Sequence, residues 1–394
     1  MIRERELQER MRDLDVPNEA AAEERSWRVV RAAHASRRAA PRRPRLRLAL
    51  APAALALLAL VLATSGTAIG DWISDLAHPG RDHAKPALSS LPDRGRLLVS
   101  SPRGPWVVRP DGSKRLLGDY HEAAWSPHGL FVVATQGRQL VATQPNGHVR
   151  WTLARPDPVG HPAWSPSGFR IAYLTGGTLR VVAGDGTGDR LLAAAVAPAT
   201  PAWRPGAQHV LAYSDRAGRI RAVATDTGQR IWTSRAGAIP RELEWSADGR
   251  RVAVVASGSV RELDGHGRLI RTLRGPVYAV RFAPTGHRLA LSRPTGLDDR
   301  SEVLLLAAAR RPRPPAPVFV GAGSLTDLAW SPNGRWLLIG WPDADQWLFI
   351  RPERPRKVIA VSNVARQFSP GAPAGRGPFP RVDGWCCAPR GAPG

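Results

Sequence analysis

The sequence predicts an all-β fold, a seven-bladed β-propeller, preceded by a single transmembrane helix and a short helical cytoplasmic leader. Three observations predict it: an aromatic-Ser-Pro-x-Gly unit recurs about every forty residues, short β-rich runs follow each unit, and one long uncharged segment lies near the N-terminus. Hydrophobic residues make up 43% of the 394 residues, which is enough for a core and excludes global disorder. Two Cys exclude a disulfide scaffold or a multi-Cys zinc module.

The repeated unit is centred on an aromatic residue that ends a predicted strand. The spacings between successive aromatic residues are 39, 39, 42, 37, 48 and 38. Because the same position recurs in every unit, we expect these side chains to pack between neighbouring blades rather than to form a ligand cage. The seven blade-packing aromatic residues are Trp125, Trp164, Trp203, Trp245, Phe282, Trp330 and Phe368.

Each unit holds four short strands. After the aromatic residue, Pro fixes φ and Gly allows positive φ in a tight turn. Two β-rich runs follow, such as 131–134 and 139–143, and then a second Gly turn such as Asn146-Gly147 precedes a last strand. Helical periodicity is absent, which excludes a helical solenoid. Four-stranded units at this period build a propeller.

The two ends of the repeat region predict how the ring closes. Residues 96–117 hold three strands with no aromatic strand before them, whereas Val364–Phe368 reads as a first strand with no followers. Together they complete one blade and leave no open sheet edge. The predicted propeller spans 94–370, with a Gly/Pro-rich tail over 371–394. A six-bladed ring is the alternative if the match at Phe368 is spurious.

The segment 48–70 contains no charged residue and is long enough to span a bilayer. The basic leader over 1–47 carries nine Arg between Arg25 and Arg47, whereas Asp71 and Asp75 open the linker over 71–93. This asymmetry places the N-terminus in the cytoplasm and the propeller outside, anchored in the plasma membrane. A cleaved signal peptide and a buried core helix are the two alternatives for this segment.

The charge constrains the partners. The chain carries 56 Lys and Arg against 33 Asp and Glu, a formal charge of +23. Such a balance favours nucleic acid, anionic lipid or acidic polymers. Outside the membrane, however, nucleic acid is an unlikely ligand, so we expect a protein partner or an anionic envelope component. The Arg residues are scattered along the blades and indicate a diffuse effect rather than one site.

The Trp-Ser-Pro-x-Gly units over about 94–370 resemble the WD-repeat-like propeller units of TolB-type proteins. The resemblance implies a binding scaffold, usually for protein partners. The Gly-His and Trp-Asp dipeptides of true WD repeats are absent as a regular pattern. The bias toward Arg, Ala, Pro and Gly is typical of a high-GC bacterium.

A search for chemistry in the sequence finds no catalytic, cofactor or metal site. There is no Gly-x-Ser-x-Gly elbow and no His-Glu-x-x-His motif, and the ten His are scattered. The acidic segments at 184–189, 298–299 and 343–345 are interpreted as turns, with weak metal sites as the alternative. The segment that contains Arg310, Arg311 and Arg313 is interpreted as a linker, with a contact for an acidic partner as the alternative. Trp151 and Trp232 only faintly resemble quinoprotein blades.

The adjacent pair Cys386 and Cys387 could form a vicinal disulfide, could bridge to another chain, or could stay free in the tail. We expect the whole protein to be a non-enzymatic, membrane-anchored scaffold, with signalling through the leader as an extension of that role. The alternatives are a propeller enzyme (lyase, cyclase or quinone-dependent dehydrogenase) and a purely structural envelope protein.

Overall fold

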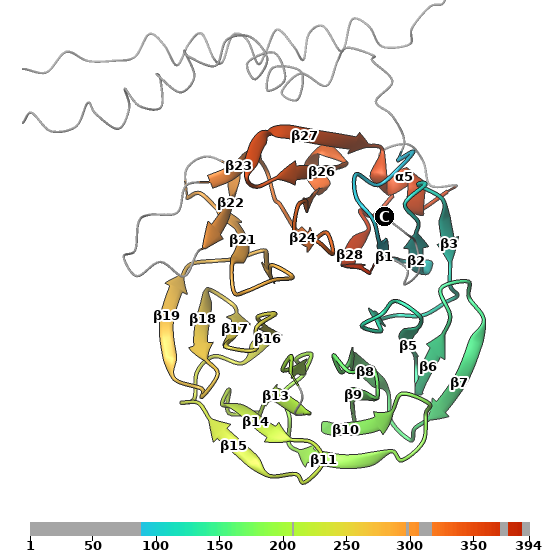
Figure 1. Ribbon diagram of the computed structural model, residues 1–394, viewed down its shortest axis with the longest axis vertical. Helices are drawn as coiled ribbons and strands as arrows, with labels where there is room; N and C mark the ends of the chain where they lie inside the picture. Colours follow the sequence, from blue (N-terminus) through green and yellow to red (C-terminus); the bar gives the residue numbers. More distant parts are fainter. Residues whose placement is uncertain (1–87, 207–208, 297–298, 307–316, 371–376, 388–394) are drawn as a thin grey trace, which may run out of the picture. The chain divides into compact units, whose positions relative to one another are not determined.

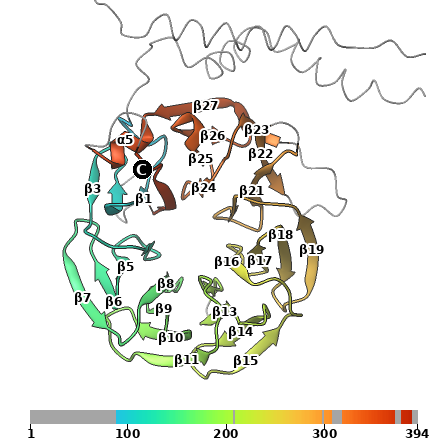
Figure 2. The same ribbon diagram turned by 180° about the vertical axis from the view of Figure 1, so that it is seen from behind.

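The computed structural model describes residues 88–206, 209–296, 299–306, 317–370 and 377–387. Over these residues the chain forms seven four-stranded antiparallel sheets, which stand as blades around a common axis (Figures 1 and 2). The prediction of a seven-bladed all-β propeller is confirmed, and the six-bladed alternative is wrong.

In six of the blades the four strands follow one another along the chain, and the first strand is innermost. The first three are β4–β7 (Ala123–Trp125, Val132–Gln136, Gln139–Thr143, Val149–Ala154), β8–β11 (Val159–Trp164, Arg170–Thr175, Thr178–Ala183, Arg190–Ala194) and β12–β15 (Ala202–Trp203, Val210–Ser214, Ile220–Ala224, Arg230–Thr233). The next three are β16–β19 (Pro240–Trp245, Arg251–Ala256, Ser259–Asp264, Leu269–Arg274), β20–β23 (Ala279–Phe282, Leu289–Pro294, Arg300–Leu306, Pro317–Ala322) and β24–β27 (Asp327–Trp330, Leu337–Trp341, Gln346–Arg351, Arg354–Ser362).

The Ser-Pro-x-Gly segment makes the turn between the first and second strands. Gly129 donates its backbone N–H to the Ser126 carbonyl at 2.8 Å, and its φ of +63° is a conformation that suits glycine. The Ser126 hydroxyl then accepts the N–H of Phe131 at 3.0 Å. These turns lie at one end of the blades, which we call the turn face (residues 126–129, 165–168, 246–249, 283–286 and 331–334). The first strands begin at the opposite end, which we call the mouth face.

Neighbouring blades are joined through the repeated aromatic residue. The indole of Trp203 donates to the Ala163 carbonyl of the preceding blade at 3.0 Å, and that of Trp245 donates to the Ala202 carbonyl at 3.1 Å. Trp330 does the same to Arg281 at 3.2 Å. Apolar side chains from both blades surround each ring, so the buried clusters lie between sheets. Each of these three Trp therefore adds a directed hydrogen bond to the packing between two blades.

The seventh blade closes the ring, but through a different strand from the one predicted. Its order is β28 (Arg381–Cys386), β1 (Arg96–Ser101), β2 (Gly104–Val108) and β3 (Lys114–Leu116). In Figure 1 the last strand of the chain lies beside the first. Trp385 takes the position of the repeated aromatic residue and donates its indole N–H to the Arg94 carbonyl at 3.2 Å. The closing strand thus lies in the segment expected to be a tail.

The expectation that Val364–Phe368 is the closing strand is wrong, because this segment is the short helix α5. The helix follows the last strand of the β24–β27 blade, and the backbone N–H of Ala365 donates to the Asp345 carboxylate at 2.7 Å. Phe368 is fully buried and packs on Trp106 and Trp347. Its 38-residue distance from Trp330 matches the repeat period, but the side chain belongs to the core beneath the closed blade.

The expectations for the leader, the transmembrane helix and most of the linker concern residues 1–87 and lie outside the described residues. Within the part that the structure describes, no helix has the length and apolar character needed to span a membrane. The linker residues from Leu88 onward already belong to the propeller, since Leu88 and Leu91 are buried against Trp336 and Phe368.

The closing strand yields the first prediction. Trp385→Ala should lower the stability of the fold by about 3–5 kcal/mol, because it removes a buried ring and the indole bond that fixes β28. Thermal unfolding measures the loss, and hydrogen exchange of the β1 amides should accelerate as the edge opens.

The matched control is Phe169→Ala, which removes an aromatic ring that is 72% exposed at a turn. This variant should change stability by less than about 0.5 kcal/mol. Equal effects of the two substitutions would contradict the assignment of β28 as the strand that holds the ring closed.

Candidate binding channel

The candidate site is the mouth of the central channel, and it is built by the innermost strands. The residues three positions before each aromatic residue line this mouth, and the residues one position before it lie further along the same strands. Three positions before, the ring reads Glu122, His161, Thr200, Glu242, Ala279, Asp327 and Val382. One position before, it reads Ala124, Ala163, Ala202, Glu244, Arg281, Ala329 and Gly384.

Five of the seven residues of the second ring are Ala or Gly. All seven residues of the first ring line a cavity with a volume of about 770 Å³. The longer side chains of the second ring, Glu244 and Arg281, come from adjacent blades. These two blades therefore form one charged side of the channel.

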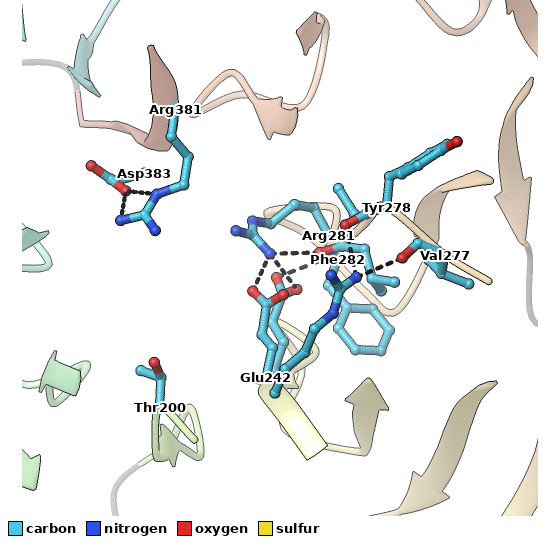
Figure 3. Close-up of polar contacts among 12 residues, drawn as sticks. Thr200, Glu242, Val277, Tyr278, Arg281, Phe282, Arg381 and Asp383 are labelled. Atoms are coloured by element: carbon cyan, nitrogen blue, oxygen red, sulfur yellow. Dashed lines mark hydrogen bonds and ion pairs between the residues drawn. The ribbon is translucent and has the colours of Figure 1, made fainter. Parts of the chain in front are cut away.

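On that side, Arg281 lies between two carboxylates of the neighbouring blade (Figure 3). Its guanidinium donates to the Glu242 carboxylate and lies 3.9 Å from the Glu244 carboxylate. Burial disfavours the charged guanidinium, but the two carboxylates outweigh this effect and raise the pKa of Arg281. The cation is thus held permanently at the channel wall.

Glu244, the neighbour of Arg281, has a strongly raised pKa. Burial raises its pKa to about 8, against an ordinary 4.5, and the proximity of Arg281 only partly opposes this. One carboxylate oxygen accepts the backbone N–H of Phe282 at 3.0 Å, while the other is buried with no hydrogen-bond partner among the described residues. A carboxyl in this state can donate a hydrogen bond at neutral pH, which an ordinary Glu cannot.

A second charged cluster comes from the closing strand and its neighbour β24. Arg381 donates to the Asp383 carboxylate at 2.8 Å (Figure 3), and this carboxylate also accepts the Ser100 hydroxyl at 2.5 Å. Asp383 is the extra residue of a bulge in β28, which turns its side chain to the channel. Burial raises the pKa of Asp327 to about 6, and the charge of Asp383 adds to the rise.

The remaining polar residues of the mouth are tied to the backbone or to one another. Arg241 donates to the carbonyls of Val277 and Tyr278 at 2.7 Å each and so joins two blades. The Glu122 carboxylate accepts the backbone N–H of His161, whose ring lies 3.2 Å from the Thr200 hydroxyl. The mouth is therefore preorganised, with polar groups of both signs fixed in place.

The predicted aromatic residues lie below this mouth. A smaller cavity of about 250 Å³ is lined by the rings of Trp125, Trp164, Trp203 and Trp245, together with Leu243 and Glu244. Trp203, Trp245, Phe282 and Trp330 are buried, whereas Trp125 and Trp164 are half-buried and their indole N–H groups have no partner among the described residues. Of the seven predicted blade-packing aromatic residues, Phe368 alone lies outside an innermost strand, in α5.

The structure joins Cys386 and Cys387 in a disulfide between adjacent residues. The Cys387 sulfur lies 2.9 Å from the Pro127 carbonyl and the Cys386 sulfur 3.6 Å from the Ser126 carbonyl. The pair thus rests on the first turn of the next blade. It stands at the turn face, at the far end of the closing strand from Arg381 and Asp383.

The acidic residues that the sequence offered as weak candidates for metal sites make hydrogen bonds and ion pairs within the fold. Asp185 and Asp343 accept hydrogen bonds from Thr187 and Ser324 in their turns, and Asp189 is paired with Arg155 and Arg180. No group of three or more His, Cys, Asp or Glu that could hold a metal ion is found among the described residues. Residues 297–298 and 307–316, which include Asp298 and the Arg run, lie outside them.

The charged residues of the mouth were absent from the candidates drawn from the sequence. The signal was available, because the register of the repeat already defines the residues one and three positions before each aromatic residue. A repeat is recognised by the residues that its units share, however, whereas this site consists of the positions at which the units differ.

Residues 315–350 match the WD domain, G-beta repeat family. A search of curated proteins finds no match. Among solved structures, Hsv2 of Kluyveromyces lactis aligns with a TM-score of 0.50 at 14% identity, over 66% of this chain and 90% of that one.

Two further structures align with a TM-score of 0.48. The β-propeller domain of Cps50 (Swd1) from Myceliophthora thermophila is 12% identical over 62% of this chain and 86% of that one. Kuenenia stuttgartiensis hydrazine synthase is 14% identical over 59% and 76%. The seven sheets and the family match together define the chain as a seven-bladed β-propeller with a WD40 repeat over residues 315–350.

The raised pKa of Glu244 yields a prediction on stability. An acid whose pKa is higher in the folded state stabilises the fold fully only below its unfolded pKa, and that stability is lost as the pH rises toward the folded value. Glu244→Gln should remove this loss. The stability of the variant relative to the wild type should rise steadily between pH 4.5 and pH 8, measured by denaturant unfolding at each pH.

Asp185→Asn provides a control of opposite sign. Hydrogen bonds from Thr187 lower the pKa of this exposed carboxyl, so its contribution is lost only as the pH falls. This variant should leave the slope at neutral and alkaline pH unchanged. If Glu244→Gln also leaves that slope unchanged, the carboxyl is ionised without cost and the assignment is wrong.

Proposed function

We propose that this protein is a non-enzymatic, membrane-anchored scaffold whose propeller lies outside the cytoplasm and binds a protein partner at the mouth of the channel. The observation that carries the proposal is the ring of differing polar residues that the inner strands hold around one opening. Rigid blades with variable residues at their ends are a common basis for recognition. The partner's side chains would enter a cavity of about 770 Å³.

The charges of the mouth favour a polypeptide over an anionic polymer. Glu122, Glu242, Asp327 and Asp383 line the cavity together with Arg241, Arg281 and Arg381. A uniformly anionic envelope polymer would meet the four carboxylates and be repelled. A polypeptide segment with charges of both signs can match the two clusters. The same reasoning disfavours nucleic acid, although the whole chain carries a formal charge of +23.

The anchoring part of the proposal rests on the sequence. The segment 48–70 has the length and apolar character of a spanning helix, and the Arg-rich leader before it favours retention in the cytoplasm. Binding outside and a leader inside would connect the two sides of the membrane, which is the basis for a signalling role.

Protease treatment of intact cells tests the topology. With a tag after Gly394, the tag should be lost while the leader stays protected. Protection of the tag until the cells are lysed would place the propeller in the cytoplasm, and the proposed location would be wrong.

Site-specific photocrosslinking tests the binding site. A photoreactive amino acid at Thr200, on the mouth, should yield a discrete crosslinked product in intact membranes. The control position is Leu269, which is 58% exposed on β19, a strand on the outer rim of the ring (Figure 1).

A product at Thr200 alone supports recognition at the channel. No product at Thr200, or the same product at both positions, contradicts it. A purified protein with a bound cofactor or a divalent metal would instead favour the propeller enzymes.

A further inference from the structure

The turn face carries a second cavity, separate from the channel mouth. It has a volume of about 740 Å³ and lies between the blades β4–β7 and β8–β11. Its wall includes Phe131 stacked on Trp164 at a centroid distance of 6.5 Å. At its edge protrude Leu130, which is 61% exposed, and Phe169, which is 72% exposed. Two large apolar side chains this exposed on neighbouring blades form a patch rather than isolated surface residues.

The other blades show that this patch is not required by the fold. Leu130 and Phe169 occupy the position directly after the turn Gly. At that position the blades β16–β19 and β24–β27 carry the exposed residues Arg250 and Arg335, and the blade β20–β23 carries His287. The turn thus accepts a basic residue without change of structure. The apolar residues are confined to two adjacent blades, beside the exposed Arg150.

The chain enters the propeller at this same face. Asp93 accepts the side-chain amide of Asn333 in a Ser-Pro-x-Gly turn at 2.9 Å, and Arg96 donates to the Gly129 carbonyl at 2.5 Å. The predicted spanning segment ends at Gly70, so the segment 71–87 joins it to the propeller at the turn face rather than at the mouth face.

We propose that the turn face docks on the anionic lipid surface of the membrane that carries the anchor, with Leu130 and Phe169 inserted at the headgroup level. This inference rests on the proposed membrane anchor. Apolar side chains gain by insertion at the boundary of headgroups and acyl chains, and Arg150, Arg250 and Arg335 are attracted to anionic headgroups. Asp185, which also lines the groove, is engaged by Thr187. Docking in this way directs the channel mouth away from the membrane.

The test uses the full chain reconstituted in vesicles of phosphatidylglycerol and neutral lipid that contain a nitroxide-labelled lipid. A fluorophore is attached to Phe169→Cys without reductant, so that the bonded pair Cys386 and Cys387 stays unlabelled. The matched control carries the fluorophore at Ile239→Cys, because Ile239 is also apolar and is 51% exposed, but lies between β15 and β16 on the mouth face. Quenching at position 169 should exceed quenching at position 239 several-fold.

Leu130→Arg in the chain labelled at position 169 gives a second readout. This variant should fold, because Arg250 and Arg335 occupy the same turn position in other blades. It should reduce quenching several-fold, whereas Ile239→Arg in the same labelled chain should not. Unchanged quenching in Leu130→Arg would contradict insertion of the patch.

Vesicle flotation separates failure of the docking from failure of the anchor. A chain that floats with the vesicles but shows no quenching at position 169 overturns the docking alone. A chain that does not float overturns both. If position 169 is shielded in native membranes but is not quenched in vesicles, a protein covers the patch, and the lipid assignment is wrong.

Discussion

Pairing of β28 with β1 is the contact on which the rest of the propeller depends. Without it, β1 would be an open edge strand, and the blade β24–β27 would lose its neighbour on one side. The pairing joins residues nearly at the two ends of the propeller, such as Leu97 and Trp385. Trp385 extends the contact to the entering chain through its bond to the Arg94 carbonyl. The other six blades are each local in sequence, and this one contact makes them a ring.

Closure also determines what the channel can contain. Seven inner strands around one axis bring one residue of every blade to the mouth, so residues far apart in the sequence line one cavity. Adjacent blades supply Glu244 and Arg281 beside it. Burial then acts on the acids that remain, which raises the pKa of Glu244 and Asp327. The electrostatics of the mouth are thus a consequence of ring geometry.

The sequence was sufficient to predict the number of blades, the strand content and the turn chemistry, because these features repeat. It failed at the closing strand for a physical reason. The partner strand of β28 comes from the beginning of the propeller, so no Ser-Pro-x-Gly turn needs to follow Trp385. Ser369-Pro370-Gly371 carries that signal at the right spacing but follows a helix. The charged residues of the mouth were missed because none of them recurs at the same position in every blade, whereas a repeat is recognised by the residues that do recur.

The placement of β28 has a consequence for the order in which the site is made. Arg381 and Asp383 contribute one of the two charged clusters of the mouth, yet they belong to the last strand of the propeller to be synthesised. A propeller interrupted before this strand would contain six complete blades and Arg281 with its carboxylates, but neither a closed ring nor the second cluster. A partner that requires both clusters would therefore bind only closed propellers, so such recognition would also be a check on closure of the ring.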